Sequence, residues 1–306
     1  MVAGKIRNSQ FAIRNSPAFT LLELLVVISI IGILAALSVP ALKNLGKSNV
    51  QVSASRQLLD DIGHARAMAV SQHTTVYMVF VPTNFFNLNN SYNGNVMAGL
   101  NNPAYIPVAS DRLTALTTAT NLVEKQLAAY ALVSYGAVGD QPGQHIWRYL
   151  TDWQFLPDGA FIAAQKFCNN GVSMNIPQWN TDYAGQLDDW RNFLPQVYAF
   201  TNAWIPFPTE KSPQVWMPYL AFDYLGRLIS ETADGASFHH AYIPLVQGSV
   251  SYSLDPATKS PLIPASPLQP GDITENPPGN STNISYNVID INPLTGRATP
   301  QHFKMP

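Results

Sequence analysis

One apolar stretch decides how this chain is organised: residues 19–42 read FTLLELLVVISIIGILAALSVPAL. No charged residue falls between positions 24 and 42. As an α-helix with a rise of ~1.5 Å per residue, that part would be about 28 Å long, close to the hydrocarbon thickness of a bilayer. Residues 1–18 carry Lys5, Arg7 and Arg14 and no acid, so the positive-inside rule keeps them cytoplasmic. We therefore expect a single-pass anchor in the inner membrane over residues 19–42, with the C-terminal domain in the periplasm.

An ordinary secretory signal peptide is the alternative reading of this stretch. Its apolar region usually runs about 7–15 residues and ends at a small-residue cleavage site. Here the apolar region is longer, and Ala35-Ala36 is followed by more apolar residues. The stretch also contains Glu23, and an ionisable residue inside a membrane costs at least ~2.5 kcal/mol at the centre. We therefore expect Glu23 to have a partner.

The residues around this carboxylate, AFTLLEL at positions 18–24 before the long apolar run, resemble the prepilin cleavage and methylation motif of type IV pilins and type II secretion pseudopilins. The resemblance implies that a prepilin peptidase cuts between Ala18 and Phe19 and methylates the new amine. It implies that Glu23 pairs with the terminal amine of a neighbouring subunit, and that Gly32 and Pro40 loosen the helix. Most members have glycine before the cut, so Ala18 predicts slower processing.

Helical periodicity continues past the apolar stretch. Apolar residues recur at three- and four-residue steps: Val52, Leu58, Leu59, Ile62, Ala65, Ala69 and Val70. One helix from Phe19 to about Ser71 would be about 80 Å long, far more than a bilayer. Its second part, residues 43–73, is therefore expected in the periplasm. All but two of the aromatic residues and all but two of the prolines follow residue 76, which predicts a β-rich domain over residues 74–306.

The predicted fold class is α+β: a long N-terminal helix, transmembrane and then amphipathic, packed on an antiparallel β-sheet, with an inserted helical region. Strands are expected at residues 74–81, 146–150 and 159–163, at 215–222 and 225–230 as a hairpin, at 238–253 as one long or two short strands, and at 284–291 and 297–303 as a closing hairpin. Helices are expected from Ser110 or Asp111 to about 134 and at 182–193, and an exposed loop at 255–280. Within the pilin-like group the chain most resembles minor pseudopilins of the GspH/FimT type. That resemblance rests on residues 60–70 (DDIGHARAMAV), 222–227 (FDYLGR) and 289–297 (IDINPLTGR). Its length and its proline, asparagine and tryptophan content also resemble Verru_Chthon cassette proteins.

Composition narrows the chemistry. Charged residues make up 12% of the chain, with 17 basic against 19 acidic residues, which argues against a nucleic-acid partner. Cys168 is the one cysteine, so an intrachain disulfide and a cysteine-cluster zinc site are excluded. The six histidines are scattered, and no catalytic or nucleotide-binding motif is present. We expect no enzyme activity, no catalytic residues, no cofactor and no metal.

The sequence therefore predicts a structural minor pilin or pseudopilin of a type IV pilus or type II secretion system. Its expected partners are the prepilin peptidase, other pilin subunits and inner-membrane lipid, and its final location is a periplasmic or cell-surface filament. An alternative is a tip adhesin or substrate-binding module on the same anchor. Four tryptophans among prolines and polar residues favour that alternative, although core packing explains them equally well: Trp179, Trp190, Trp204 and Trp216.

Overall fold

The computed structural model describes residues 20–88, 90–91, 94–136, 140, 145–167, 199–229, 240–252, 256, 272–278 and 285–304. The chain divides into two compact units, Met1–Gly46 and Lys47–Pro306. Helix α1, Leu21–Gln72, contains residues of both units and is helical through Gly32 and Pro40. The start and end predicted for this helix agree with its bounds within two residues. A bend at Gly32 and Pro40 stays a prediction, as do the domain boundaries at residues 18, 42 and 73.

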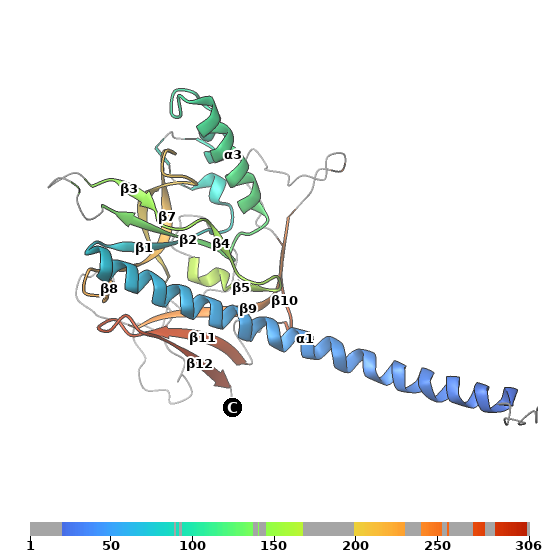
Figure 1. Cartoon of the computed structure of the whole chain (residues 1–306). Coiled ribbons are helices and arrows are strands. Elements are labelled where there is room, and N and C mark those ends of the chain that lie inside the picture. The colour runs from blue at the N-terminus through green and yellow to red at the C-terminus, as the bar shows by residue number, and fades with distance from the viewer. Residues whose placement is uncertain are drawn as a thin grey trace, which may run out of the picture. The chain divides into compact units, whose positions relative to one another are not determined.

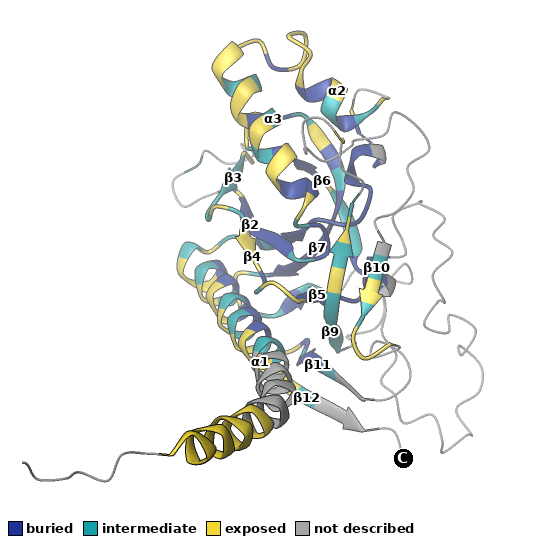
Figure 2. Ribbon diagram, turned by 90° about the vertical axis from the view of Figure 1, so that its right-hand side faces the viewer, coloured by how far each residue is buried: buried dark blue, intermediate teal, exposed yellow. Residues whose placement is uncertain are grey.

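The first unit presents apolar side chains to its surroundings. Every residue from 21 to 34 is exposed (Figure 2), and the large apolar ones range from 44% exposed at Val27 to 86% at Leu21. None of the described helices combines the length and apolar content that crossing a bilayer requires.

The second unit contains two antiparallel sheets (Figure 1). The first has the order β3-β2-β1-β7-β6, with β4 on β2 and β8 on β7. Its strands are Val76–Phe80 (β1), Ala129–Tyr135 (β2), Trp147–Tyr149 (β3), Gln154–Phe155 (β4), Thr201–Pro206 (β6), Gln214–Phe222 (β7) and Leu228–Ile229 (β8). The second has the order β10-β9-β11-β12, with β5 on β9. Its strands are Ala160–Ile162 (β5), Ala241–Ser251 (β9), Asp272–Glu275 (β10), Ser285–Ile291 (β11) and Ala298–Lys304 (β12).

The second part of α1 packs into the larger of two cores. Its buried side chains follow one another at three- and four-residue steps and form a single apolar stripe: Ala54, Leu58, Ile62, Ala65 and Ala69. This stripe joins a cluster with Phe80 of β1, Phe222 of β7, Ile243 of β9 and Ile289 of β11. Because both sheets contribute to this cluster, α1 connects them through its apolar face.

A second core lies on the opposite face of the first sheet. Side chains alternate along β1, so that Met78 and Phe80 join the α1 core while Val79 joins the other. Two helices cover this second core, α2 (Val96–Leu100) and α3 (Ala109–Val123). The described part of this unit also contains two short 3-10 helices, η1 (Phe85–Asn87) and η2 (Ala164–Phe167). Figure 1 shows α1 and α3 on opposite sides of β1 and β2.

The α+β class and most strands agree with the sequence prediction, and within the range 238–253 the described residues form one strand, β9 (Ala241–Ser251). The helix expected to reach residue 134 is wrong after Val123, because residues 129–135 are β2. This strand is buried on both faces, so its apolar run lacks the alternation that identifies a strand. The exposed loop expected at 255–280 is wrong at β10, which pairs with β9. The helix expected at 182–193 lies outside the described residues.

Candidate functional site

The N-terminus of α1 is closed by two residues of the prepilin-like segment. The carbonyl of Thr20 accepts the first helical bond, from Leu24 N, at 3.2 Å. Thr20 Oγ1 accepts from Glu23 N at 3.2 Å, while Glu23 Oε2 accepts from Thr20 N and Thr20 Oγ1, each at 3.2 Å. This reciprocal arrangement is a capping box, which satisfies donors that the first helical turn leaves unpaired. This role of Thr20 was not predicted from the sequence, although the spacing Thr-x-x-Glu before an apolar run is the local signature of a capping box.

Glu23 keeps capacity for a second partner. Its side chain is exposed, and both side-chain bonds that it accepts end on Oε2. An ionised carboxylate offers about four acceptor positions, so Oε1 can accept from a donor outside the chain. The predicted cleavage residues, Ala18 and Phe19, lie outside the described residues. Gly32 lies in α1 with no side-chain or distant backbone atom within 4 Å of a Cβ built on it.

A second feature is formed by two tight turns of the second unit. In the turn after β7, Asp223 Oδ1 accepts from Leu225 N at 2.9 Å and from Arg227 N at 2.8 Å. Asp223 Oδ2 accepts from Arg227 Nε at 2.8 Å. In the turn after β11, Asn292 Oδ1 accepts from Leu294 N and Thr295 N, each at 3.0 Å. Each turn is thus organised by one Asp or Asn side chain that caps its own backbone.

Arg66 of α1 forms hydrogen bonds with both of these turns. Its Nε donates to Gly226 O at 3.2 Å and to Thr295 O at 2.7 Å. Gly296 has φ +62°, and a Cβ built on it would overlap the carbonyl oxygen of Gly226. The three segments on which the minor pseudopilin resemblance rests therefore meet at one place, which we call the turn junction. Four exposed apolar side chains surround it: Val70, Tyr224, Leu225 and Leu294.

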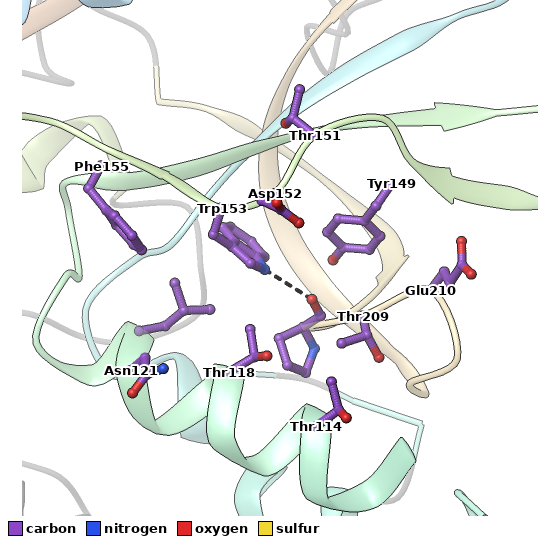
Figure 3. Close-up of a pocket in the computed structure, with 12 residues that line it drawn as sticks. Thr114, Thr118, Asn121, Tyr149, Thr151, Asp152, Trp153, Phe155, Thr209 and Glu210 are labelled. Carbon is purple, nitrogen blue, oxygen red and sulfur yellow. Dashed lines mark hydrogen bonds between the residues drawn. The ribbon is translucent and has the colours of Figure 1, made fainter. Parts of the chain in front are cut away.

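A groove of 400 Å³ lies between α3 and the segments around β3, β4 and the turn after β6 (Figure 3). One side carries Thr118 and Asn121 of α3, and the other carries Asp152 and Trp153. Trp153 Nε1 donates to Pro208 O at 3.0 Å, which fixes the plane of the indole ring. Helical spacing places Thr114, Thr118 and Asn121 on one face of α3.

Tyr149 forms a second aromatic wall of this groove. Its hydroxyl donates to Pro206 O at 2.7 Å, and its ring centroid lies 6.0 Å from that of Trp153. Burial, and then the negative charge of Glu210, raise the pKa of the Tyr149 phenol. The phenol therefore stays neutral and keeps donating to the backbone. The positions of Trp153 and Tyr149 in this groove could not be predicted from the sequence, because the groove is assembled from segments distant in the chain.

The remaining candidate residues take structural positions or lie outside the described residues. His240 Nδ1 lies 2.6 Å from Asp290 Oδ1, and Gln301 Nε2 donates to Asp290 Oδ2 at 2.6 Å. In the part of the chain that the structure describes, no three His, Cys, Asp or Glu residues form a group that could hold a metal ion. Trp204 and Trp216 pair across β6 and β7 with ring centroids 5.3 Å apart. Outside the described residues lie Cys168, Trp179, Trp190 and His239.

Comparison with known proteins identifies the N-terminal segment. No curated protein and no solved structure matches the chain. Residues 13–39 match the family described as the prokaryotic N-terminal methylation motif. The matched range includes the predicted cleavage position, Thr20 and Glu23. This match supports a subunit of the type IV pilin and pseudopilin kind, whose processing by a prepilin peptidase and assembly with other pilins the motif implies.

Proposed function

We propose that the chain is a structural minor pilin or pseudopilin. In this proposal the prepilin peptidase removes residues 1–18, residues 19–42 hold the subunit in the inner membrane, and Glu23 directs its incorporation into a filament. The match of residues 13–39 to the methylation motif carries the proposal. The exposed apolar side chains of residues 21–34 support it, since such a surface marks a segment that contacts lipid or other protein.

The capping box gives this proposal a physical basis. Cleavage before Phe19 would place a charged amine one residue before Thr20, the cap of α1. An unpaired charge is costly in apolar surroundings, so the amine favours a position where it meets a carboxylate. Glu23 of a neighbouring subunit, displaced along the filament axis, provides that carboxylate through Oε1. Apolar contact between the helices gives cohesion, while the ion pair sets the register.

Mass spectrometry of the N-terminus of the subunit purified from cells tests the first step. We expect a chain that begins at N-methylated Phe19. Deleting the prepilin peptidase should leave residues 1–18 in place, which is the control. An uncut chain in cells that contain the peptidase, or a chain cut after Ala36 as a signal peptide would be, contradicts the proposal.

The groove beside α3 favours a second candidate, a binding module carried on the same anchor. Its polar side chains and aromatic walls face an accessible space, which a purely structural subunit does not require. This candidate shares the processing and anchoring steps with the first. The two candidates differ in whether the second unit binds a ligand.

A further inference from the structure

We propose that the groove beside α3 binds a neutral saccharide. The inference goes beyond filament assembly and concerns the second unit alone, so it does not depend on the role of Glu23. The groove has a volume of 400 Å³, within the size range of small-molecule sites. Its lining combines the aromatic side chains of Tyr149, Trp153 and Phe155 and the apolar Leu122 and Pro208 with hydroxyl, amide and carboxylate groups (Figure 3).

The aromatic walls present flat apolar surfaces of fixed orientation. The Tyr149 hydroxyl and the Trp153 N–H already donate to the carbonyls of Pro206 and Pro208. Neither side chain therefore has a proton left to donate, and what the two residues chiefly offer a ligand is ring surface. Trp153 also packs edge to face against Phe207, with ring centroids 5.5 Å apart, which restricts its rotation further. The C–H face of a pyranose ring packs against such rigid rings at little entropic cost.

The polar side chains suit hydroxyl groups. Among the described residues, the side chains of Thr118, Asn121, Asp152 and Glu210 have no hydrogen-bond partner. Asn121 both donates and accepts, Thr118 does the same through one oxygen, and the two carboxylates accept only. A sugar hydroxyl donates and accepts at once, so adjacent hydroxyls can donate to Asp152 while accepting from Asn121. Figure 3 shows these two residues on opposite sides of the groove.

The charge of the lining selects a neutral ligand. The lining carries two acids, Asp152 and Glu210, and no lysine or arginine. The two nearby lysines are paired with acids: Lys125 with Asp158 at 2.8 Å and Lys211 with Asp111 at 3.2 Å. A phosphate or an acidic sugar would therefore be repelled. A cationic ligand could pair with the two carboxylates but not with the amide N–H donors of Asn121, whereas a sugar hydroxyl can bond to both kinds of group.

Binding can be measured on the full-length chain in a detergent that has no sugar head group, so that the detergent does not compete. The neutral probes are maltotetraose, cellotetraose, chitotetraose and mannotetraose, and the charged probes are tetragalacturonate and tetralysine, each titrated by calorimetry and saturation-transfer NMR. We expect millimolar or tighter binding of at least one neutral probe and none of either charged probe. Absence of binding by all four neutral probes, or equal binding of a charged probe, overturns the proposal.

Variants then locate the site. The double variant N121A/D152N changes two exposed side chains, so it should fold normally and weaken binding of the responding probe by at least about tenfold. W153A should weaken it as much, while W204A, which removes an exposed tryptophan outside the groove, should leave it unchanged. Unaltered binding by N121A/D152N overturns the proposal, as does loss of binding in W204A. E23Q should bind the probe normally, which separates failure of the groove from failure of filament assembly.

Discussion

At the residue scale, Glu23 meets two demands with one carboxylate. Within its own chain it accepts two hydrogen bonds from Thr20 on Oε2. In the proposed filament it also receives the amine of a neighbour. The first demand requires an acceptor oxygen, whereas the second requires a negative charge. Because glutamine supplies the acceptor without the charge, the two demands can be separated by substitution.

We predict that Glu23→Gln inserts into the membrane and is processed normally but is not incorporated into filaments. Glutamine preserves the capping box, and the lost charge leaves the neighbour's amine unpaired. Immunoblotting of sheared filaments against total membrane protein measures the incorporation. Thr20→Ser keeps both the hydroxyl and the charge, so it should assemble as the unmodified chain does. Normal incorporation of Glu23→Gln would show that the charge of Glu23 does not direct assembly.

Lys166 illustrates a charge placed inside the second unit. It is 3% exposed, and its Nζ lies 4.8 Å from the centroid of the Phe200 ring. Burial lowers the pKa of this amine from 10.5 to about 7. Between those two pH values the unfolded chain binds a proton that the folded chain does not. The free energy of unfolding should therefore rise with pH across this window and level off below it.

We predict that Lys166→Met removes this rise, which we expect to be about 2–4 kcal/mol between neutral pH and pH about 10. Methionine fills a similar volume and binds no proton, so the stability of the variant should not follow the titration of this amine. Urea unfolding at several pH values measures the difference. Lys211→Met, at a 63% exposed side chain, is the control that should keep the slope. Parallel pH profiles for the unmodified chain and Lys166→Met would contradict the prediction.

At the element scale, α1 is attached to the second unit by polar bonds as well as by its apolar stripe. Tyr130 of β2 donates to Asp61 Oδ2 at 2.5 Å and accepts from Gln57 Nε2 at 2.9 Å. Burial, followed by the bond to Asp61, raises the pKa of the Tyr130 phenol. These bonds place α1 in one rotation about its own axis, since Gln57 and Asp61 are four residues apart on one face.

We predict that Tyr130→Phe lowers the free energy of unfolding by about 1–3 kcal/mol, because Asp61 loses a donor in a partly buried site and Gln57 loses one of its two acceptors. Chemical denaturation followed by circular dichroism measures the loss. Tyr224→Phe removes a hydroxyl from a side chain that is 54% exposed, and it should change stability by less than about 0.5 kcal/mol. Equal effects of the two substitutions would show that the bonds of Tyr130 add little.

Two glycines of the second unit give opposite predictions for the same substitution. Gly296→Ala forces a Cβ against the carbonyl of Gly226 at a positive φ, so we expect a loss of about 2–4 kcal/mol. Gly63→Ala adds a Cβ to an exposed helical position where no atom lies within 4 Å of it other than local helix backbone, so we expect a gain of about 0.5–1 kcal/mol. Thermal unfolding compares them. A decrease in melting temperature for Gly63→Ala, or no decrease for Gly296→Ala, would contradict this account.

At the scale of the whole molecule, the features that the sequence predicted are those set by residues close together in the chain. The stripe of α1 follows from periodicity, and the hairpin turns follow from Asp223, Gly226, Asn292 and Gly296, whose chemistry acts over a few residues. The capping residue Thr20 was equally local and could have been found. Strand β2 could not, because neither of its faces is polar. The groove and the turn junction could not either, because only the pairing of distant strands brings Asn121 to Trp153 and Arg66 to Thr295.

The two-sheet core also has a consequence for synthesis. The apolar stripe of α1 is covered in part by strands β9 and β11. In the sequence these strands are separated from the stripe by most of the second unit. In the proposed location outside the inner membrane, export would release Leu58 and Ile62 from the translocation channel well before Ile243 and Ile289, which cover them in the folded unit. Closing so large a loop is slow. A nascent subunit would therefore expose the apolar stripe of α1 to chaperones and proteases until the hairpin of β11 and β12 emerged. Formation of that hairpin would thus decide whether the subunit folds or is degraded.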